Sequence, residues 1–288
     1  MEEAAFVAAL RGGGARVFVV GGWVRDRLRG AAAADKDYVV SGIGEAAFCA
    51  LFPDAQRVGR SFPVYLVTVD GKRAEVAFAR RERKTGPGYR GFAVAFSPEV
   101  TSEEDLYRRD TTMNSIALEL PEGRLIDLYG GREDIARGRV RAVSSHFVED
   151  PVRALRAARQ AALFGYEITE ETLAYMRACR AELAREPGER IFAELRRALG
   201  AVQPSAFFRW LARAGVLDVT FPELAALIGK TQPQAFHPEG DAFEHTMLVL
   251  DRVAAETGDV RARFTALAHD IGKGRTPQAM LPHHYGHE

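Results

Sequence analysis

The sequence predicts an α+β protein in which a mixed β-sheet with helices is followed by helices only. Hairpin signals occur only in the first half of the 288-residue chain, and after Val143 the pattern changes to almost continuous helix. Strand-rich and helix-rich segments that follow one another in this way are typical of α+β proteins. We expect three parts, at residues 1–140, 141–200 and 201–288.

Composition limits the classes of protein to which the chain can belong. It has 39 basic and 39 acidic residues, so any nucleic-acid contact must come from local arginine clusters rather than from net charge. Cys49 and Cys179 form no metal or disulfide pattern. Residues 1–14 lack the features of a signal peptide, and no apolar run approaches membrane-spanning length. We therefore expect a soluble, cytoplasmic protein without membrane contact.

The first expected site lies where an apolar run ends in two glycines. Residues 17–20 predict a buried strand, and Gly21 and Gly22, which lack a Cβ, let a phosphate approach the backbone closely. Residues 24–28 predict the first turn of a helix, whose N-terminus favours anions, and Arg25 adds a positive charge. The segment therefore predicts a phosphate-binding turn.

A pair of carboxylates follows this turn. Asp35 and Asp37 are two residues apart in a segment that runs into residues 38–40, which predict a strand. Residues two apart on a strand share a face, so we expect both carboxylates to reach one metal cluster. Glu75 is a candidate third carboxylate, with an exposed charge on a strand as the alternative. Carboxylate oxygens suit Mg²⁺, and metal-assisted transfer from a nucleoside triphosphate needs such a pair beside a phosphate cradle.

The remaining elements follow from turn signals and helical spacing. Two hairpins are predicted: Val64–Val69 with Lys72–Phe78 around Asp70-Gly71, and Ser115–Leu120 with Arg124–Leu128 around Pro121-Glu122-Gly123. The segment between them, Arg83–Gly91, is basic and rich in Gly and Pro and is expected to be a loop. Four helices are expected, at Pro151–Phe164, Glu170–Glu182, Glu189–Leu199 and Pro204–Ala214.

A second candidate site precedes the second hairpin, at Arg108–Asn114. Arginines there, Arg109 among them, can hold phosphates, while Asp110 and Asn114 can hydrogen-bond a ribose. The alternative is a helix N-cap at Asp110 with solvated arginines, and the residues alone do not decide between the two.

A candidate base-reading pair opens the first long helix. Asp150 followed by Pro151 is a standard helix start. However, Asp150 only accepts hydrogen bonds and Arg153 only donates them. Adenine and cytosine present an amino donor beside a ring-nitrogen acceptor, and guanine and uracil present the reverse order, so this pair can select A and C. Arg156 and Arg159 continue a basic stripe that can stack on a base or hold phosphates.

A third candidate site lies in the last part of the chain. An isolated histidine on an apolar helix is usually a core residue. The pair His269-Asp270, with His245 upstream, has instead the spacing of metal ligands. Further candidate ligands are His283, His284 and His287.

In this order the motifs resemble the class II tRNA nucleotidyltransferases, and the His-Asp segment resembles the HD domain of the bacterial, multifunctional CCA-adding type. The resemblance spans nearly the whole chain. It implies a catalytic head with the nucleotidyltransferase fold at 1–140, a helical neck that recognises the incoming base at 141–200, and a helical body with a partial HD phosphohydrolase domain at 201–288. It also implies roles: Mg²⁺ at Asp35 and Asp37, the triphosphate at Gly21, Gly22 and Arg25, the sugar at Asp110 and Asn114, and the base at Asp150 and Arg153.

The activity that the resemblance implies is template-independent addition of CCA to the 3′ end of tRNA from CTP and ATP, with two Mg²⁺ ions and release of pyrophosphate. The HD site is expected to take Ni²⁺ or another divalent transition metal, if any. Alternatives are a poly(A) polymerase, a partial CC- or A-adding enzyme, or an HD phosphohydrolase whose N-terminal domain binds RNA. The oligomeric state stays open.

Two departures from the family pattern matter. The stretch Val58–Phe62 lacks the two consecutive basic residues of the related poly(A) polymerases, which favours CCA addition. The chain also ends at Glu288, short of the last metal-binding aspartate expected in an HD domain. We therefore expect little hydrolase activity from the HD segment.

Overall fold

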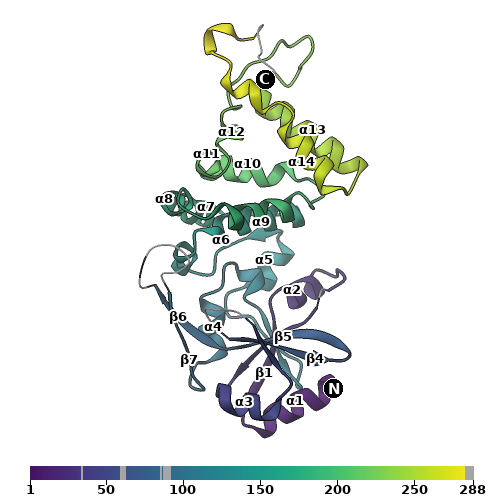
Figure 1. Cartoon of the computed structure of the whole chain (residues 1–288), viewed down its shortest axis with the longest axis vertical. Helices are drawn as coiled ribbons and strands as arrows, with labels where there is room; N and C mark the ends of the chain where they lie inside the picture. The colour runs from purple at the N-terminus through teal and green to yellow at the C-terminus, as the bar shows by residue number, and fades with distance from the viewer. Residues whose placement is uncertain (34, 59–62, 85, 87–91, 283–288) are drawn as a thin grey trace. The chain divides into compact units, whose positions relative to one another are not determined.

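The protein consists of two compact units in a computed structural model that describes residues 1–33, 35–58, 63–84, 86 and 92–282. The first unit is Met1–Arg137 with Arg141–Glu149, and the second is Gly138–Val140 with Asp150–Glu288. The first contains the large β-sheet and the second is almost entirely helical (Figure 1). The division into head, neck and body stays a prediction.

A seven-stranded mixed sheet organises the first unit, with the order β3-β4-β5-β2-β1-β8-β9. Its strands are β1 (Arg16–Val20), β2 (Asp37–Ser41), β3 (Gln56–Val58), β4 (Val64–Val69), β5 (Lys72–Phe78), β8 (Ala117–Leu120) and β9 (Arg124–Ile126). Strands β2 and β5 pair in parallel, and the other neighbours pair antiparallel. This arrangement confirms the predicted mixed sheet.

Both predicted hairpins are present. Asp70 and Gly71 connect β4 to β5 with φ angles of 50° and 74°, the left-handed conformation that a tight two-residue turn needs at both positions. The second hairpin joins β8 to β9 and has shorter strands than predicted. The loop prediction is partly wrong, because Arg83 and Lys84 belong to β6 (Arg80–Lys84), which pairs with β7 (Phe92–Phe96). Residues 85 and 87–91 lie outside the described residues, as do 59–62.

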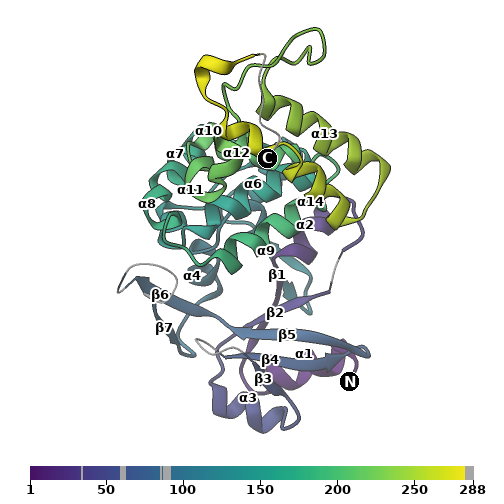
Figure 2. The same cartoon turned by 45° about the horizontal axis from the view of Figure 1, so that its top comes forward.

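Helices cover both faces of the large sheet. Helices α1 (Glu3–Gly12) and α3 (Glu45–Leu51) lie together against one face (Figures 1 and 2), where Phe6 and Phe48 pack with Val19. On the other face, Leu106 of α4 (Ser102–Tyr107) packs with Phe18. Alternate residues of β1 thus enter opposite cores, as expected for a central strand. The unit also contains α2 (Gly22–Leu28), α5 (Gly131–Ala136) and 3₁₀ helices at Thr112–Asn114 and Ser145–Glu149.

The second unit is built from helices and one pair of two-residue strands, β10 (Arg139–Val140) and β11 (Glu167–Ile168). Its helices are α6 (Val152–Phe164), α7 (Glu170–Ala178), α8 (Arg180–Leu183), α9 (Gly188–Ala198), α10 (Ser205–Ala214), α11 (Leu217–Thr220), α12 (Pro222–Ala225), α13 (Ala242–Glu256) and α14 (Val260–Ala268), with 3₁₀ helices at Ile271–Arg275 and Gln278–Met280. The four predicted helices are confirmed, although the second is divided at Cys179.

Helices α13 and α14 lie side by side in both views (Figures 1 and 2). In the part of the chain that the structure describes, no helix combines the length and the hydropathy that a membrane span requires.

Candidate functional site

The predicted phosphate-binding turn joins β1 to α2. Gly21 has φ 70° and ψ −131°, a conformation that L side chains rarely adopt, and it immediately precedes α2. A Cβ at Gly21 would lie 3.6 Å from the Nη1 atom of Arg109, so the glycine backbone runs close to that guanidinium. The strand–turn–helix prediction is confirmed, and the turn has a positive charge beside it.

Arg25 connects this turn to the second predicted site. Its guanidinium donates two hydrogen bonds of 2.9 Å to Asp26 and one of 2.8 Å to the Oδ1 atom of Asn114. The amide of Asn114 in turn donates to Asp110 at 3.0 Å. Residues that the resemblance assigns to the triphosphate and to the sugar are therefore brought together, although they are 89 positions apart in the chain.

Arg108 and Arg109 are anchored by a carboxylate that the sequence reasoning missed. Asp105 is only 3% exposed and accepts hydrogen bonds from Arg108 at 3.2 Å and from Arg109 at 3.0 Å. Burial alone would raise the pKa of Asp105, but Arg109 and Arg108 outweigh it and hold the pKa below its ordinary value. An aspartate three and four residues before two arginines was the available signal.

The alternative reading of this segment, an N-cap at Asp110 with solvated arginines, is wrong. The short helix starts after Thr111, and Asp110 accepts the Thr111 backbone N–H at 2.8 Å and the Asn114 amide instead. The side chains of Arg108 and Arg109 are 13% and 20% exposed. They are therefore held in ion pairs within the unit.

Asp37 is the first residue of β2 and lies directly opposite Glu75 of the parallel strand β5. Both line an open cavity of about 240 Å³, together with Arg109. Although Asp37 is exposed as a residue, partial burial of its carboxylate raises its pKa, the charges of Glu75 and Asp35 raise it further, and Arg109 opposes them. The cavity thus places two carboxylates side by side, as a divalent cation requires, with arginines also in its lining.

The expectation that Asp35 and Asp37 share a strand face is wrong in this structure, because β2 begins only at Asp37. Asp35 is exposed and lines a different cavity, which also contains Trp23 and Lys36. The neighbouring Lys36 binds Glu3 of α1 with Nζ–O distances of 2.6 and 2.8 Å. This contact connects the segment before β2 to α1.

In the second unit, Asp150 serves both as a helix start and as an ion-pair partner. Its Oδ1 accepts the backbone N–H of Val152 at 3.3 Å, and both oxygens accept hydrogen bonds from Arg190 of α9, at 3.0 and 2.9 Å. Arg153 lies one turn further on and is 8% exposed. Arg190, which is 40 positions from Asp150, was not among the predicted site residues.

The basic stripe on α6 is only partly available to a ligand. Arg159 donates a hydrogen bond of 2.5 Å to Glu194 of α9, and its side chain is 14% exposed. Burial lowers the pKa of Arg159 below its ordinary value, while Glu194 opposes that effect. Arg156 is half-buried. A role of these two arginines in base stacking or phosphate binding stays a prediction.

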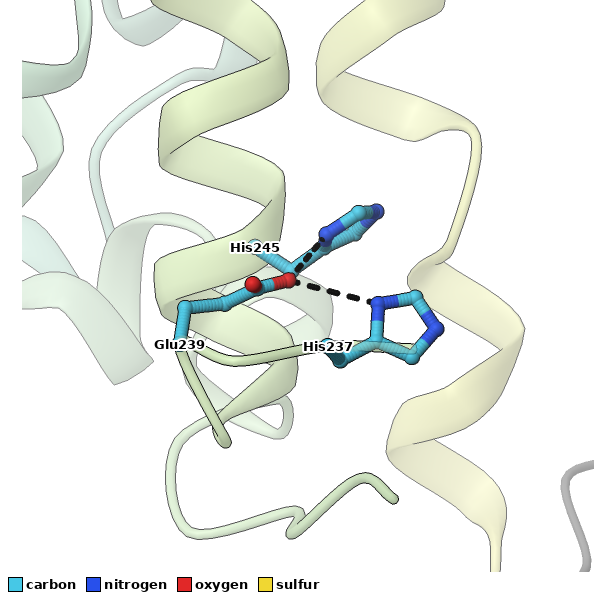
Figure 3. A group of neighbouring side chains, drawn as sticks. All are labelled: His237, Glu239 and His245. Atoms are coloured by element: carbon cyan, nitrogen blue, oxygen red, sulfur yellow. Dashed lines mark hydrogen bonds and ion pairs between the residues drawn. The ribbon is translucent and has the colours of Figure 1, made fainter. Parts of the chain in front are cut away.

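Two groups of possible metal ligands lie in the second unit. The predicted residues His245, His269 and Asp270 have ligand atoms within 4.8 Å of one another. A second group, which the sequence reasoning missed, contains His237, Glu239 and His245 (Figure 3). Among the described residues, Asp35, Asp37 and Glu75 form no such group. His283, His284 and His287 lie outside the described residues.

The geometry of the predicted group is defined by its hydrogen bonds. The Nε2 atoms of His269 and His245 lie 3.2 and 3.8 Å from the Oδ2 atom of Asp270. The Nδ1 atom of His269 lies 2.7 Å from the carbonyl oxygen of Ala266, which leaves the Nε2 atom of that ring facing the carboxylate. The ammonium group of Lys273 donates to the same Asp270 oxygen at 2.7 Å.

Two protein-family models match separate regions of the chain. A model described as the poly(A) polymerase head domain matches residues 17–141. A model described as a probable RNA- and SrmB-binding site of polymerase A matches residues 165–228.

Curated relatives match almost the whole chain. The multifunctional CCA protein of Nitrosococcus oceani is 49% identical over 273 residues, which are 94% of this chain and 66% of that protein. Those of Methylococcus capsulatus and Thioalkalivibrio sulfidiphilus are 47% and 46% identical over 278 residues, which are 95% of this chain and 64% and 67% of the relatives. The chain thus spans about two thirds of the length of these relatives.

Solved structures share the fold. The Bacillus stearothermophilus CCA-adding enzyme in complex with CTP superposes with a TM-score of 0.68 at 28% identity, covering 93% of this chain and 65% of that one. The Thermotoga maritima CCA-adding enzyme in complex with tRNA gives a TM-score of 0.65 at 27% identity, covering 93% and 62%.

Proposed function

Because the chain belongs to the bacterial multifunctional CCA proteins, which are class II CCA-adding enzymes, we propose that it adds C, C and A to the 3′ end of tRNA from CTP and ATP. The observation that supports this proposal is the hydrogen bond between Arg25 and Asn114, which joins the turn proposed to bind phosphates to the segment proposed to bind the sugar. The first unit then acts as the nucleotidyltransferase head. Helices after residue 150 form a base-reading neck and a body, and the site of action is the cytoplasm.

In the proposed reaction the terminal ribose hydroxyl attacks the α-phosphate in line. An O–P bond forms, the bond to the β-phosphate breaks, and pyrophosphate leaves. Asp37 and Asp35, with Glu75 as a third carboxylate, would hold Mg²⁺, since carboxylate oxygens are the ligands that it prefers. When bound, Mg²⁺ neutralises the triphosphate and favours deprotonation of the hydroxyl. Arg109 beside Gly21 adds a fixed positive charge where phosphates approach.

The test of this function uses tRNA transcripts that lack the last one, two or three nucleotides. Each transcript is incubated with Mg²⁺ and with CTP or ATP alone. We expect CMP to be added to the two shorter transcripts, and a single AMP to the one that ends in CC. Continued addition of AMP would indicate a poly(A) polymerase, and CMP or AMP addition alone a partial enzyme. Absence of incorporation from every transcript would contradict nucleotidyl transfer and favour an RNA-binding unit joined to an HD phosphohydrolase.

A prediction about base choice follows for the second unit. If Asp150 and Arg153 read the base edge, replacing Arg153 with Ala relaxes discrimination against UTP and GTP by about 1–3 kcal/mol, the value typical of one bidentate contact. Arg190→Ala should relax selectivity in the same direction, because its two hydrogen bonds orient the Asp150 carboxylate. The measurement is the ratio of kcat/KM for CTP and UTP.

The matched control for these arginines is Arg185→Ala, because Arg185 is exposed in the turn after α8. It should leave the CTP to UTP ratio unchanged. If the Arg153→Ala variant folds, incorporates CMP and keeps the natural preference for CTP over UTP, Asp150 and Arg153 only stabilise the helix and do not read the base.

We further propose that His245, His269 and Asp270 bind a divalent transition metal, such as Ni²⁺, in an HD-type site. The proposal is supported by the two Nε2 atoms that face the Asp270 carboxylate. Imidazole and carboxylate ligands suit such metals, and coordination positions left to water suit a hydrolytic site. We expect little phosphohydrolase activity from this segment, and nucleotidyl transfer that is independent of it.

A further inference from the structure

The second unit contains a second group of possible metal ligands, of which the proposed function uses only His245. We propose that His237, Glu239 and His245 form a second transition-metal position, separate from the position formed by His245, His269 and Asp270. This goes beyond the proposed function and does not depend on nucleotide addition. The class of ligand is a divalent ion that prefers nitrogen and oxygen donors, with Zn²⁺ as the representative.

The three side chains converge on one point. The Oε1 atom of Glu239 lies 2.5 Å from the Nδ1 atom of His245 and 3.3 Å from the Nδ1 atom of His237. One carboxylate oxygen thus faces the Nδ1 atoms of both imidazole rings (Figure 3), whose centroids are 4.7 Å apart. Two imidazole nitrogens and one carboxylate oxygen, completed by water, form a ligand set that Zn²⁺ commonly takes in tetrahedral sites.

The segment that supplies two of these ligands is held in place by its backbone. The N–H of Gln232 donates to the carbonyl oxygen of Gly240 at 2.9 Å, and the N–H of His237 donates to Pro233 at 3.0 Å. At the end of the segment, the Asp241 side chain caps α13 by accepting the N–H of Glu244 at 3.1 Å. His245 lies on the first turns of that helix. The segment that carries the ligands is therefore ordered before an ion arrives, which lowers the cost of binding it.

The group is accessible to an ion. The side chains of His237, Glu239 and His245 are 26%, 14% and 22% exposed. The possible metal ligands are therefore neither fully buried nor fully exposed. Partial exposure leaves room for the water ligands that complete the coordination shell.

His245 is shared between the two positions. Its Nδ1 atom faces Glu239, and its Nε2 atom lies 3.8 Å from Asp270. A neutral imidazole has a lone pair on only one nitrogen. The two metal positions therefore compete for His245. Both can be occupied at once only if the ring loses the protons of both nitrogens. The alternative role for Glu239 is to accept the Nδ1–H of His245 and so orient Nε2 toward a metal at Asp270.

The experiment separates these two roles with the full chain, freed of metal by a chelator. The starting point is a double variant that carries His269→Ala and Asp270→Asn. It lacks two ligands of the first metal position, and the asparagine keeps the shape of the side chain that contacts Lys273. Zn²⁺ is titrated in competition with a chromophoric chelator, and the visible spectrum of bound Co²⁺ reports the ligands. We expect this double variant to bind one Zn²⁺ per chain. Adding Glu239→Gln or His237→Ala should weaken that binding at least about tenfold, since even the loss of an outer-shell partner costs 10–100-fold.

Glu244→Gln is the matched control, because Glu244 precedes His245 but pairs with Arg209. It should leave Zn²⁺ affinity unchanged. Glu239→Gln in the otherwise natural chain gives a second test that leaves Asp270 intact. If the double variant binds no Zn²⁺, while Glu239→Gln and His237→Ala retain one ion with the natural Co²⁺ spectrum, the second position does not exist. Nucleotide addition is measured in parallel and should be unchanged in every variant. Failure of the proposed nucleotidyltransferase function can therefore be distinguished from absence of the second metal position.

Discussion

Replacing Asp37 with Asn is expected to abolish nucleotide addition while the fold is retained. The variant keeps the shape of the side chain but removes its charge from the cavity that Asp37 shares with Glu75 and Arg109. A metal-held charge cluster typically contributes several kcal/mol to transition-state stabilisation. We therefore expect the rate of CMP addition to fall by roughly three orders of magnitude, because about 1.4 kcal/mol of activation free energy corresponds to each factor of ten in rate. The rate is measured in a single turnover at saturating Mg²⁺.

Two further variants define the role of Asp35. The structure separates its cavity from that of Asp37, whereas the family resemblance predicts that both bind the same ions. Equal loss of activity in Asp35→Asn would show that its carboxylate turns toward the metal when substrate binds. Asp54→Asn, at an exposed position, serves as the control and should keep full activity. Near-normal incorporation by Asp37→Asn would refute its assignment as a metal ligand.

Asp105→Asn is expected to destabilise the first unit by about 3–5 kcal/mol, the range typical of breaking a buried ion pair by removing one partner. The variant leaves the half-buried guanidinium groups of Arg108 and Arg109 without this buried carboxylate. Urea unfolding followed by tryptophan fluorescence measures the effect. The chain has two tryptophans, so Trp210→Phe leaves Trp23 as the reporter of the first unit.

The same substitution should change how stability depends on pH. The pKa of Asp105 is held below its ordinary value, because the attraction of Arg109 and Arg108 outweighs the effect of burial. Its contribution is therefore complete above the pKa of the unfolded chain, about 3.9, and is lost as the pH falls through the lower folded value. Asp105→Asn should show a smaller loss of stability over that acidic range. Identical slopes for the variant and the natural chain would contradict this role.

The sequence by itself determined the features that depend on neighbouring residues. The Asp70-Gly71 turn was predictable because both residues tolerate positive φ, and the two flanking runs have strand periodicity. The turn at Gly21 was predictable for the same reason, since an apolar strand ends in residues without a Cβ. The long helices were predictable because helical spacing persists over several turns within one segment.

Only the tertiary structure decided which side chains meet. Arg190 reaches Asp150 across 40 positions, and Glu239 reaches His245 from a segment without regular structure, so neither contact leaves a periodic trace in the sequence. Asp35 shows the opposite case: its spacing from Asp37 suggested a shared strand face, but β2 begins only at Asp37. Where a strand begins depends on its partners, here β1 and β5, because interstrand hydrogen bonds rather than local preference fix its end.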